Sequence, residues 1–185
     1  LTGLCNTLII TLFAIILSVA LGTLIAIIRA THDRQGTHRV LNDLCQVYLT
    51  IIRGTPTMVQ LLIIYYVVFA SADVNKLVVA VIAFGMNSAA YIAEVIRSGI
   101  MSVDRGQMEA GRSLGLSYAT TMRLIILPQA FKNVLPAMGN ELITLLKETS
   151  ISGYIGLVDL TKGSDIIRSI TYEAMLPLGI VAAIY

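Results

Sequence analysis

The sequence is poor in charged residues, and this shortage sets the first limit on what the protein is. Charged types make up 13% of the 185 residues, whereas hydrophobic types make up 56% and the mean hydropathy is +0.82. A soluble domain of ordinary composition is about 25% charged. A chain of this size has too little charge to keep so much apolar surface in water. The composition excludes a disordered chain and nearly all soluble enzymes, and it predicts an integral membrane protein.

Cysteine, histidine and net charge are also scarce. Cys5 and Cys45 lie in or beside apolar stretches without paired spacing, and His32 and His38 share one polar loop. These positions predict no metal site and no catalytic constellation at membrane depth, which disfavours an intramembrane enzyme. The net charge of +2 is too small to indicate a nucleic acid as partner.

Long runs with few or no charges predict membrane spans, because a helix needs about 20 residues to cross the hydrocarbon core. Such runs predict spans over residues 1–28, 44–70, 77–96 and 122–146, and a fifth span begins near Glu173. Pro56 predicts a kink or a fresh start within the second span, and Pro128, Lys132 and Pro136 predict interruptions of the fourth. The expected fold is an all-α integral membrane protein, a bundle of about five transmembrane helices.

The ends and loops of the chain indicate its organisation and orientation. The chain begins and ends inside apolar runs and has no internal repeat, so we expect one domain, truncated at both ends, over residues 1–185. The loops over residues 29–43 and 97–123 carry more Lys and Arg than the loops on the other side. The positive-inside rule therefore predicts that these loops are cytoplasmic and that the chain starts outside a plasma or bacterial inner membrane.

A short amphipathic helix is predicted at about residues 106–117, between the third and fourth spans. Its small residues allow another backbone to approach closely, and Glu109 and Arg112, three residues apart, share a face that is available for ion pairs. Gly115 is typical of a helix stop and Ser117 of a cap for the next helix. The residues alone leave two interpretations open: a helix lying in the membrane interface, or a helix on which another protein docks.

This loop resembles the cytoplasmic signature loop of ABC importer permease subunits. That signature reads Glu-Ala-Ala, three residues, Gly and then Ile-Leu-Pro; here the matching residues are Glu109-Ala110-Gly111, Gly115 and Ile126-Leu127-Pro128. Gly111 replaces the second Ala and keeps the position small. Segments 53–60, 91–100 and 146–150 are similar to the polar amino-acid branch of that family. The resemblance covers essentially the whole chain, which is identified as the transmembrane permease subunit of a polar amino-acid ABC importer of the histidine, glutamine and arginine type.

The resemblance implies a division of labour. A permease subunit moves a polar amino acid into the cytoplasm and is driven by ATP hydrolysis on a partner, so this chain would not be an enzyme and would hold no cofactor. The sequence has no Gly-x-x-x-x-Gly-Lys-Ser/Thr loop to cradle phosphates, so ATP and magnesium are expected on the partner. The implied coupling helix that the ATPase grips consists of Glu109, Ala110, Gly111, Arg112, Ser113, Leu114, Gly115 and Leu116.

The resemblance also implies several partners. These are cytoplasmic ABC ATPase subunits, a second permease subunit that is identical or related, an extracytoplasmic amino-acid-binding protein or fused binding domain, and membrane lipid.

Charged residues at membrane depth are candidates for the substrate pathway. A charge at the centre of a span costs roughly 2.5–3.5 kcal/mol on insertion scales, so it faces a partner or a water-filled cavity. Residues near span ends, such as Arg53 and Lys132, can instead extend to the membrane surface. An amino-acid zwitterion needs both of its charges matched inside such a cavity. The pathway candidates are Arg53, Thr55, Glu94, Glu141, Lys147, Glu148, Thr149 and Ser150.

Two alternatives stay open at this point. Asn140-Glu141 and Lys147-Glu148 are compatible with an internal ion-pair network, a gate or a ligand site. The alternative function is a secondary transporter or channel driven by an ion gradient, in which Glu94 and Glu141 would be proton or sodium sites. A gradient-driven carrier has no need of the helix around Glu109, which favours the ATP-driven function.

Overall fold

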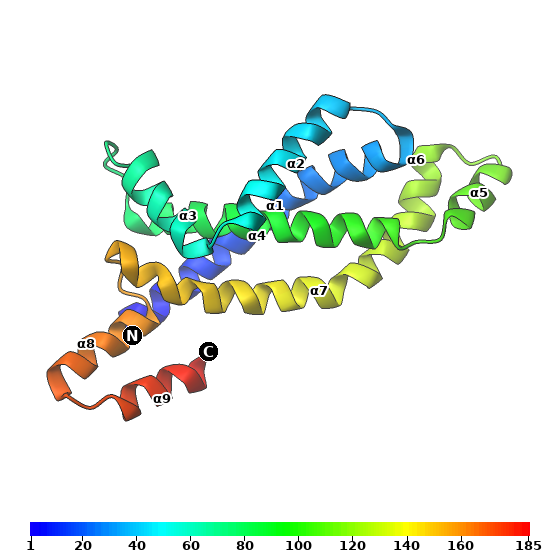
Figure 1. The fold of residues 1–185 in the computed structure, drawn as a ribbon. Helices are drawn as coiled ribbons and strands as arrows, with labels where there is room; N and C mark the ends of the chain where they lie inside the picture. The colour runs from blue at the N-terminus through cyan, green and yellow to red at the C-terminus, as the bar shows by residue number, and fades with distance from the viewer.

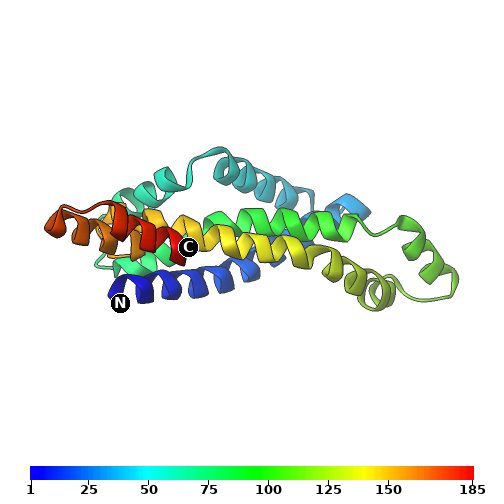
Figure 2. The ribbon, with the colours of Figure 1, turned by 90° about the horizontal axis from the view of Figure 1, so that it is seen from below.

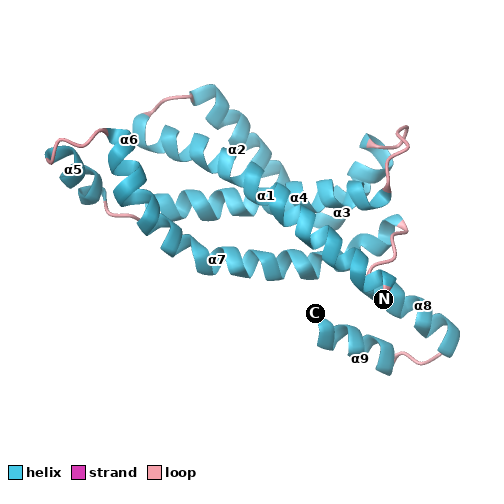
Figure 3. Ribbon diagram, turned by 180° about the vertical axis from the view of Figure 1, so that it is seen from behind, coloured by secondary structure: helices cyan, strands magenta, loops and turns pink.

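The computed structural model describes residues 1–185, which form a bundle of helices joined by short loops and contain no strand (Figure 3). Three long helices, α1, α4 and α7, run beside one another (Figures 1 and 2). Short helices α5 and α6 lie at one end of the bundle, and the N-terminus lies at the other (Figure 1). The elements are α1 (Thr2–Gln35), α2 (Arg39–Gly54), α3 (Thr57–Ile63), η1 (Ile64–Val68), α4 (Lys76–Met101), α5 (Arg105–Ser113), α6 (Tyr118–Thr121), η2 (Met122–Ile126), α7 (Leu127–Glu148), η3 (Thr149–Ile155), α8 (Leu160–Thr171) and α9 (Met175–Ile184).

Helices α1 and α4 are long and apolar enough to cross a membrane. The pair formed by α2 and the segment Thr57–Val68 passes the same test jointly, but the two parts are bent by 109°. The bend lies at Thr55-Pro56, because Pro56 supplies no backbone donor and forces the preceding residue into an extended conformation. The predicted break inside the second span is confirmed.

Two expectations about element boundaries were wrong. Arg29, Asp33 and Arg34 were expected in a polar loop, but α1 continues without a break to Gln35 and ends at Gly36, which has φ 69°. Nothing before Gly36 breaks the helix, and all three charged side chains find partners on α4. Likewise α7 was expected to be interrupted, yet it is continuous. The π-helical segment η2 leads directly into Pro128 in the first turn of α7, and Pro136 is accommodated within the helix.

The close contact between α1 and α4 depends on glycine. A Cβ atom on Gly22 of α1 would lie 2.9 Å from the carbonyl oxygen of Ala89 and 2.8 Å from Cγ2 of Ile92. A Cβ on Gly85 of α4 would lie 2.7 Å from Cδ2 of Leu17. Together with the fully buried run Ser88-Ala89-Ala90, these glycines form a seam of small residues that lets the two backbones approach. These small residues therefore serve packing within the chain.

We predict that Gly22→Ala destabilises the protein by about 1–3 kcal/mol, because the new methyl group meets the backbone of α4 and the helices must separate. The matched control is Gly139→Ala in α7, where an added Cβ meets nothing within 4 Å. This control should gain up to about 1 kcal/mol from helix propensity. The measurement is the thermal unfolding midpoint of the purified protein in detergent. Equal midpoints for the two variants would contradict the seam.

Candidate functional site

The loop between α4 and α7 contains the helix that the sequence singles out. Helix α5 covers Arg105–Ser113, somewhat shorter than the expected 106–117. The side chain of Asp104 caps it by accepting a hydrogen bond from the Gly106 amide (2.7 Å). It ends at Leu114-Gly115, where Gly115 has φ 82°, and the Ser117 side chain caps α6 by accepting from the Thr120 amide (3.1 Å). The expected glycine stop and serine cap are both present.

One face of α5 rests on the protein and the rest is exposed. Gly111 is buried against Thr121 of α6, whose Oγ1 atom would lie 2.8 Å from a Cβ at position 111. This close contact explains why the position must stay small. The remaining residues that the resemblance assigns to coupling are exposed apart from the half-buried Leu116, and Leu114 is 80% exposed. Glu109 and Arg112 form no ion pair with each other, so both charges are available to another molecule.

The segment Gly111-Arg112-Ser113-Leu114-Gly115 also matches the Gly-x-Ser-x-Gly pattern of hydrolases. In that pattern the serine sits on a sharp turn between a strand and a helix. Here Ser113 is the exposed last residue of a helix that no strand precedes, and both histidines are on another loop. The geometry required of a nucleophile is therefore missing.

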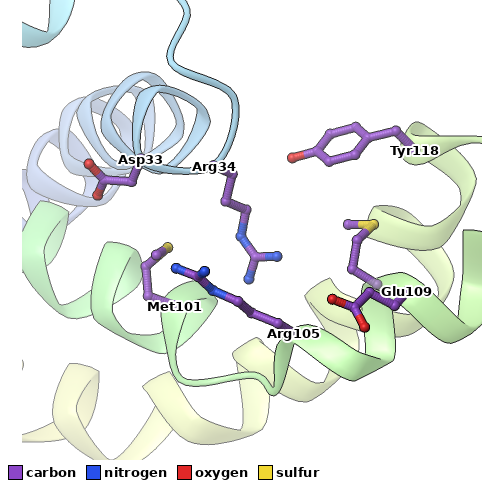
Figure 4. A pocket seen from close by; sticks show the side chains of 7 residues that line it. Asp33, Arg34, Met101, Arg105, Glu109 and Tyr118 are labelled. Atoms are coloured by element: carbon purple, nitrogen blue, oxygen red, sulfur yellow. The ribbon is translucent and has the colours of Figure 1, made fainter.

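A recess of about 240 Å³ lies between α5 and the neighbouring ends of α1 and α4 (Figure 4). Arg34 of α1 and Arg105 of α5 extend into it, and Glu109 and Tyr118 lie on its far side (Figure 4). Arg34 Nη2 donates a hydrogen bond to the carbonyl oxygen of Ile100 (2.7 Å), which fixes this arginine to the last turn of α4. The recess is therefore bounded by α5 and by the ends of both long helices.

A cluster of four charges links α1 to α4 close to this recess. Arg29 donates to Glu94 (2.7 Å), Arg97 donates to Asp33 (2.8 Å), and Arg97 also pairs with Glu94. Glu94 is a predicted pathway residue, and the structure matches its charge with two arginines. Sequence reasoning missed Arg29, Asp33 and Arg97 because it assigned them to loops. Arg29 and Arg97 share a signal, because each is a charge directly after a predicted span end, and Asp33 follows Arg29 by about one helical turn.

A larger hollow of about 650 Å³ opens between α4 and α7 and reaches Arg53 at the bend of the second span. It brings together three of the predicted pathway residues, Arg53, Glu94 and Glu141, with Tyr91 and Asn133. The Arg53 guanidinium lies 5.6 Å from the centre of the Tyr91 ring, a cation–π contact. Glu141 Oε1 accepts a hydrogen bond from Ser88 Oγ (2.9 Å). The hollow thus offers charges of both signs and neutral donors.

The other predicted pathway residues do not line this hollow. Glu148 accepts a hydrogen bond from Thr57 (3.3 Å), Thr149 is buried and donates to the Leu146 carbonyl oxygen (2.6 Å), and Ser150 follows it in η3. Lys147 is exposed and takes part in no ion pair, so the ion-pair network considered for Glu141, Lys147 and Glu148 does not form.

Sequence reasoning missed a buried amide network at the bend, although Thr55 belongs to it. Gln60 Nε2 donates to the carbonyl oxygens of Ile52 (2.6 Å) and Thr55 (3.0 Å) and to Thr55 Oγ1 (2.7 Å). Gln60 Oε1 accepts from Asn87 Nδ2 of α4 (2.9 Å). Gln60 thus satisfies carbonyl groups that the break at Pro56 leaves without helical partners. An amide four residues after a proline in an apolar run is the signal that could have found it.

Comparison with solved structures places this fold among ABC transporters. The chain is similar to an amino acid ABC transporter crystallised with histidines, with a TM-score of 0.88 and 44% identity over 99% of this chain and 84% of that chain. It also shares its fold with the MetNI methionine ABC transporter in an inward-facing form, with a TM-score of 0.77 and 19% identity over 98% of this chain and 87% of that one.

The curated relatives of this chain are permease proteins of amino-acid transport systems. An arginine transport system permease protein of Bacillus subtilis strain 168 is 38% identical over 187 residues, which cover 100% of this chain and 83% of the relative. A putative glutamine transport system permease protein of Rickettsia prowazekii strain Madrid E is 40% identical over 171 residues, covering 91% and 76%. The model of the family described as "Binding-protein-dependent transport system inner membrane component" matches residues 18–185. The chain therefore belongs to the family of inner membrane components of binding-protein-dependent transport systems.

Proposed function

We propose that this chain is the membrane-spanning permease subunit of an importer that moves a polar amino acid into the cytoplasm, driven by ATP hydrolysis on a partner subunit. The observation that carries the proposal is α5, a capped helix with one face on the bundle and its charged face exposed. Family membership and the transport of glutamine and arginine named for its relatives support the same function. A carrier driven by an ion gradient would leave α5 without a role, and the family argues against it.

The proposed assembly follows from what the chain contains. It has no phosphate-binding loop, so ATP and magnesium would bind to cytoplasmic ATPase subunits that grip Glu109 to Leu116. A second permease subunit, identical or related, and an extracytoplasmic amino-acid-binding protein, separate or fused, complete the complex in lipid. In this arrangement the α5 end is cytoplasmic and the chain start is outside. We assign residues 1–185 to one transmembrane domain of about five spans, with α1, the bent pair α2 and α3, α4, α7 and α9 as the spans.

We place the substrate pathway at the hollow between α4 and α7. An amino acid carries an ammonium and a carboxylate, and both must be matched once water is left behind. Arg53 offers a cation for the carboxylate, and Glu141 offers an acceptor for the ammonium, while Arg29 and Arg97 already match Glu94. Closing of the ATPase subunits would move α5 and so change which side of the hollow is open. A substrate held equally well in both states would not be moved, so the grip must weaken on the inward side.

The first test concerns the coupling helix. Glu109→Ala should abolish most ATP-driven uptake in proteoliposomes, because an exposed charge that pairs with the ATPase is lost. Gly115→Ala should act similarly, since the left-handed backbone there costs a non-glycine residue roughly 1–2 kcal/mol. Thr37→Ala, an exposed change on a neighbouring loop, is the control. The proposal fails if no ATPase copurifies with the wild-type chain, or if uptake by both variants equals that of the wild type.

The second test concerns the hollow. Glu141→Gln removes the charge but keeps a hydrogen-bond acceptor for Ser88, so the KM for uptake should rise about tenfold, equivalent to about 1.4 kcal/mol, while basal ATP hydrolysis is unchanged. Lys147→Gln is the matched control, because Lys147 is exposed and outside the hollow. An unchanged KM in Glu141→Gln would remove Glu141 from the pathway.

A further inference from the structure

The recess beside α5 holds two positive groups that no acidic residue of this chain neutralises. Arg34 and Arg105 come from different helices, and the side chains of both extend into the recess (Figure 4). Neither forms an ion pair, although Arg29, Arg97 and Arg168 all do. The Nε atom of Arg34 is buried and has no hydrogen-bond partner.

The other charges around the recess do not supply the missing anion. Asp33, on the wall of the recess, is paired with Arg97. Glu109 lines the opposite side and forms no ion pair with either arginine. Two like charges in a recess repel each other, and the repulsion grows as water is removed. A carboxylate between them would convert that repulsion into two charge-assisted hydrogen-bonded contacts, since guanidinium groups match carboxylates in shape.

We propose that this recess receives an acidic side chain, Asp or Glu, of the ATPase subunit; the inference rests on the proposed function. Arg105 and Glu109 of α5 are exposed and line the recess, so a protein docked on the exposed face of α5 would cover the recess and remove its water. Its volume of about 240 Å³ suits a single inserted side chain. Tyr118, whose hydroxyl makes no hydrogen bond within the chain, lines the same recess and adds a third possible donor.

The contact would have a mechanical consequence beyond docking. Arg34 is the second-last residue of α1 and is bonded to the Ile100 carbonyl oxygen of α4, whereas Arg105 begins α5. A carboxylate that holds both arginines would join the ATPase to α1 and α4 as well as to α5. The ATPase would then move the two long helices of the bundle together with the coupling helix.

Zero-length cross-linking of the whole complex tests this contact. Arg105→Lys and Arg34→Lys each place an amine in the recess, and a carbodiimide joins an amine to a carboxylate that touches it. Both variants should give a covalent permease–ATPase product in several-fold higher yield than the wild type, which reports the background from the natural lysines. Arg39→Lys is the matched control, because Arg39 is exposed and outside the recess. Mass spectrometry of the product identifies the acidic residue.

Each outcome decides the question. A cross-link within the chain, from position 105 to Glu109, would show that Glu109 fills the recess and would overturn the proposal. The proposal is also overturned if the ATPase copurifies but neither variant gives more intersubunit product than Arg39→Lys. A small free anion in the recess would give this same result. Failure of the ATPase to copurify with the wild type would instead overturn the proposed function.

A charge exchange provides the second measurement. Arg105→Glu should weaken the affinity of the permease for the ATPase by about 30-fold or more, as expected for a covered charge pair that is broken. Changing the identified acidic residue of the ATPase to Arg should restore most of that loss in the Arg105→Glu complex. If the reversed charge pair does not restore the affinity, Arg105 acts through folding alone and the proposed contact is refuted.

Discussion

The contact between α1 and α4 is the constraint on which the rest of the structure depends. Burial of apolar surface provides little drive between helices in lipid, because the surrounding chains are as apolar as the side chains. Close packing and polar links must hold the helices instead. Gly22 and Gly85 permit the close packing, and the pairs of Arg29 with Glu94 and of Arg97 with Asp33 supply the polar links at one end. Removal of either set would loosen the unit that positions everything else.

Helix α4 then positions the remaining elements through neighbouring residues. Asn87 bonds to Gln60 at the bend of the second span, and the next residue, Ser88, bonds to Glu141 of α7. The two bonds leave α4 in different directions. The adjacent residues Asn87 and Ser88 therefore position both the bend of the second span and the α7 side of the hollow. At the far end of α4, the Ile100 carbonyl oxygen receives Arg34, and the chain turns directly into the loop that carries α5. A shift of α4 would therefore displace both the hollow and α5.

The sequence predicted much of this fold because its signals were local. Apolar runs predicted the spans at α1, at α4 and at the bent pair of α2 and Thr57–Val68. Pro56 predicted the bend, and Gly115 and Ser117 predicted the end of α5 and the start of α6. The errors came from side chains whose partners are distant in sequence. The end of α1 was misassigned because a charged residue such as Arg29 after an apolar run is typical of a loop. Its partner, Glu94, is 65 positions away in the sequence, so the pairing was not visible there. The gathering of Arg53, Glu94 and Glu141 around one hollow, and the exclusion of Lys147 from it, likewise depended on which faces the helices present.

The amide network around Gln60 makes the bend of the second span at Thr55-Pro56 rigid. The Gln60 side chain donates to Ile52 and Thr55 and accepts from Asn87, and these hydrogen bonds tie the two halves to each other and to α4. Helix α7, by contrast, buries only Ala130, Val134 and Leu145 against the chain. The bend that carries Arg53 to the hollow is thus tied to α4 by buried polar side chains, whereas α7 buries few side chains. A displacement of α7 would therefore change the width of the hollow while disturbing few buried side chains.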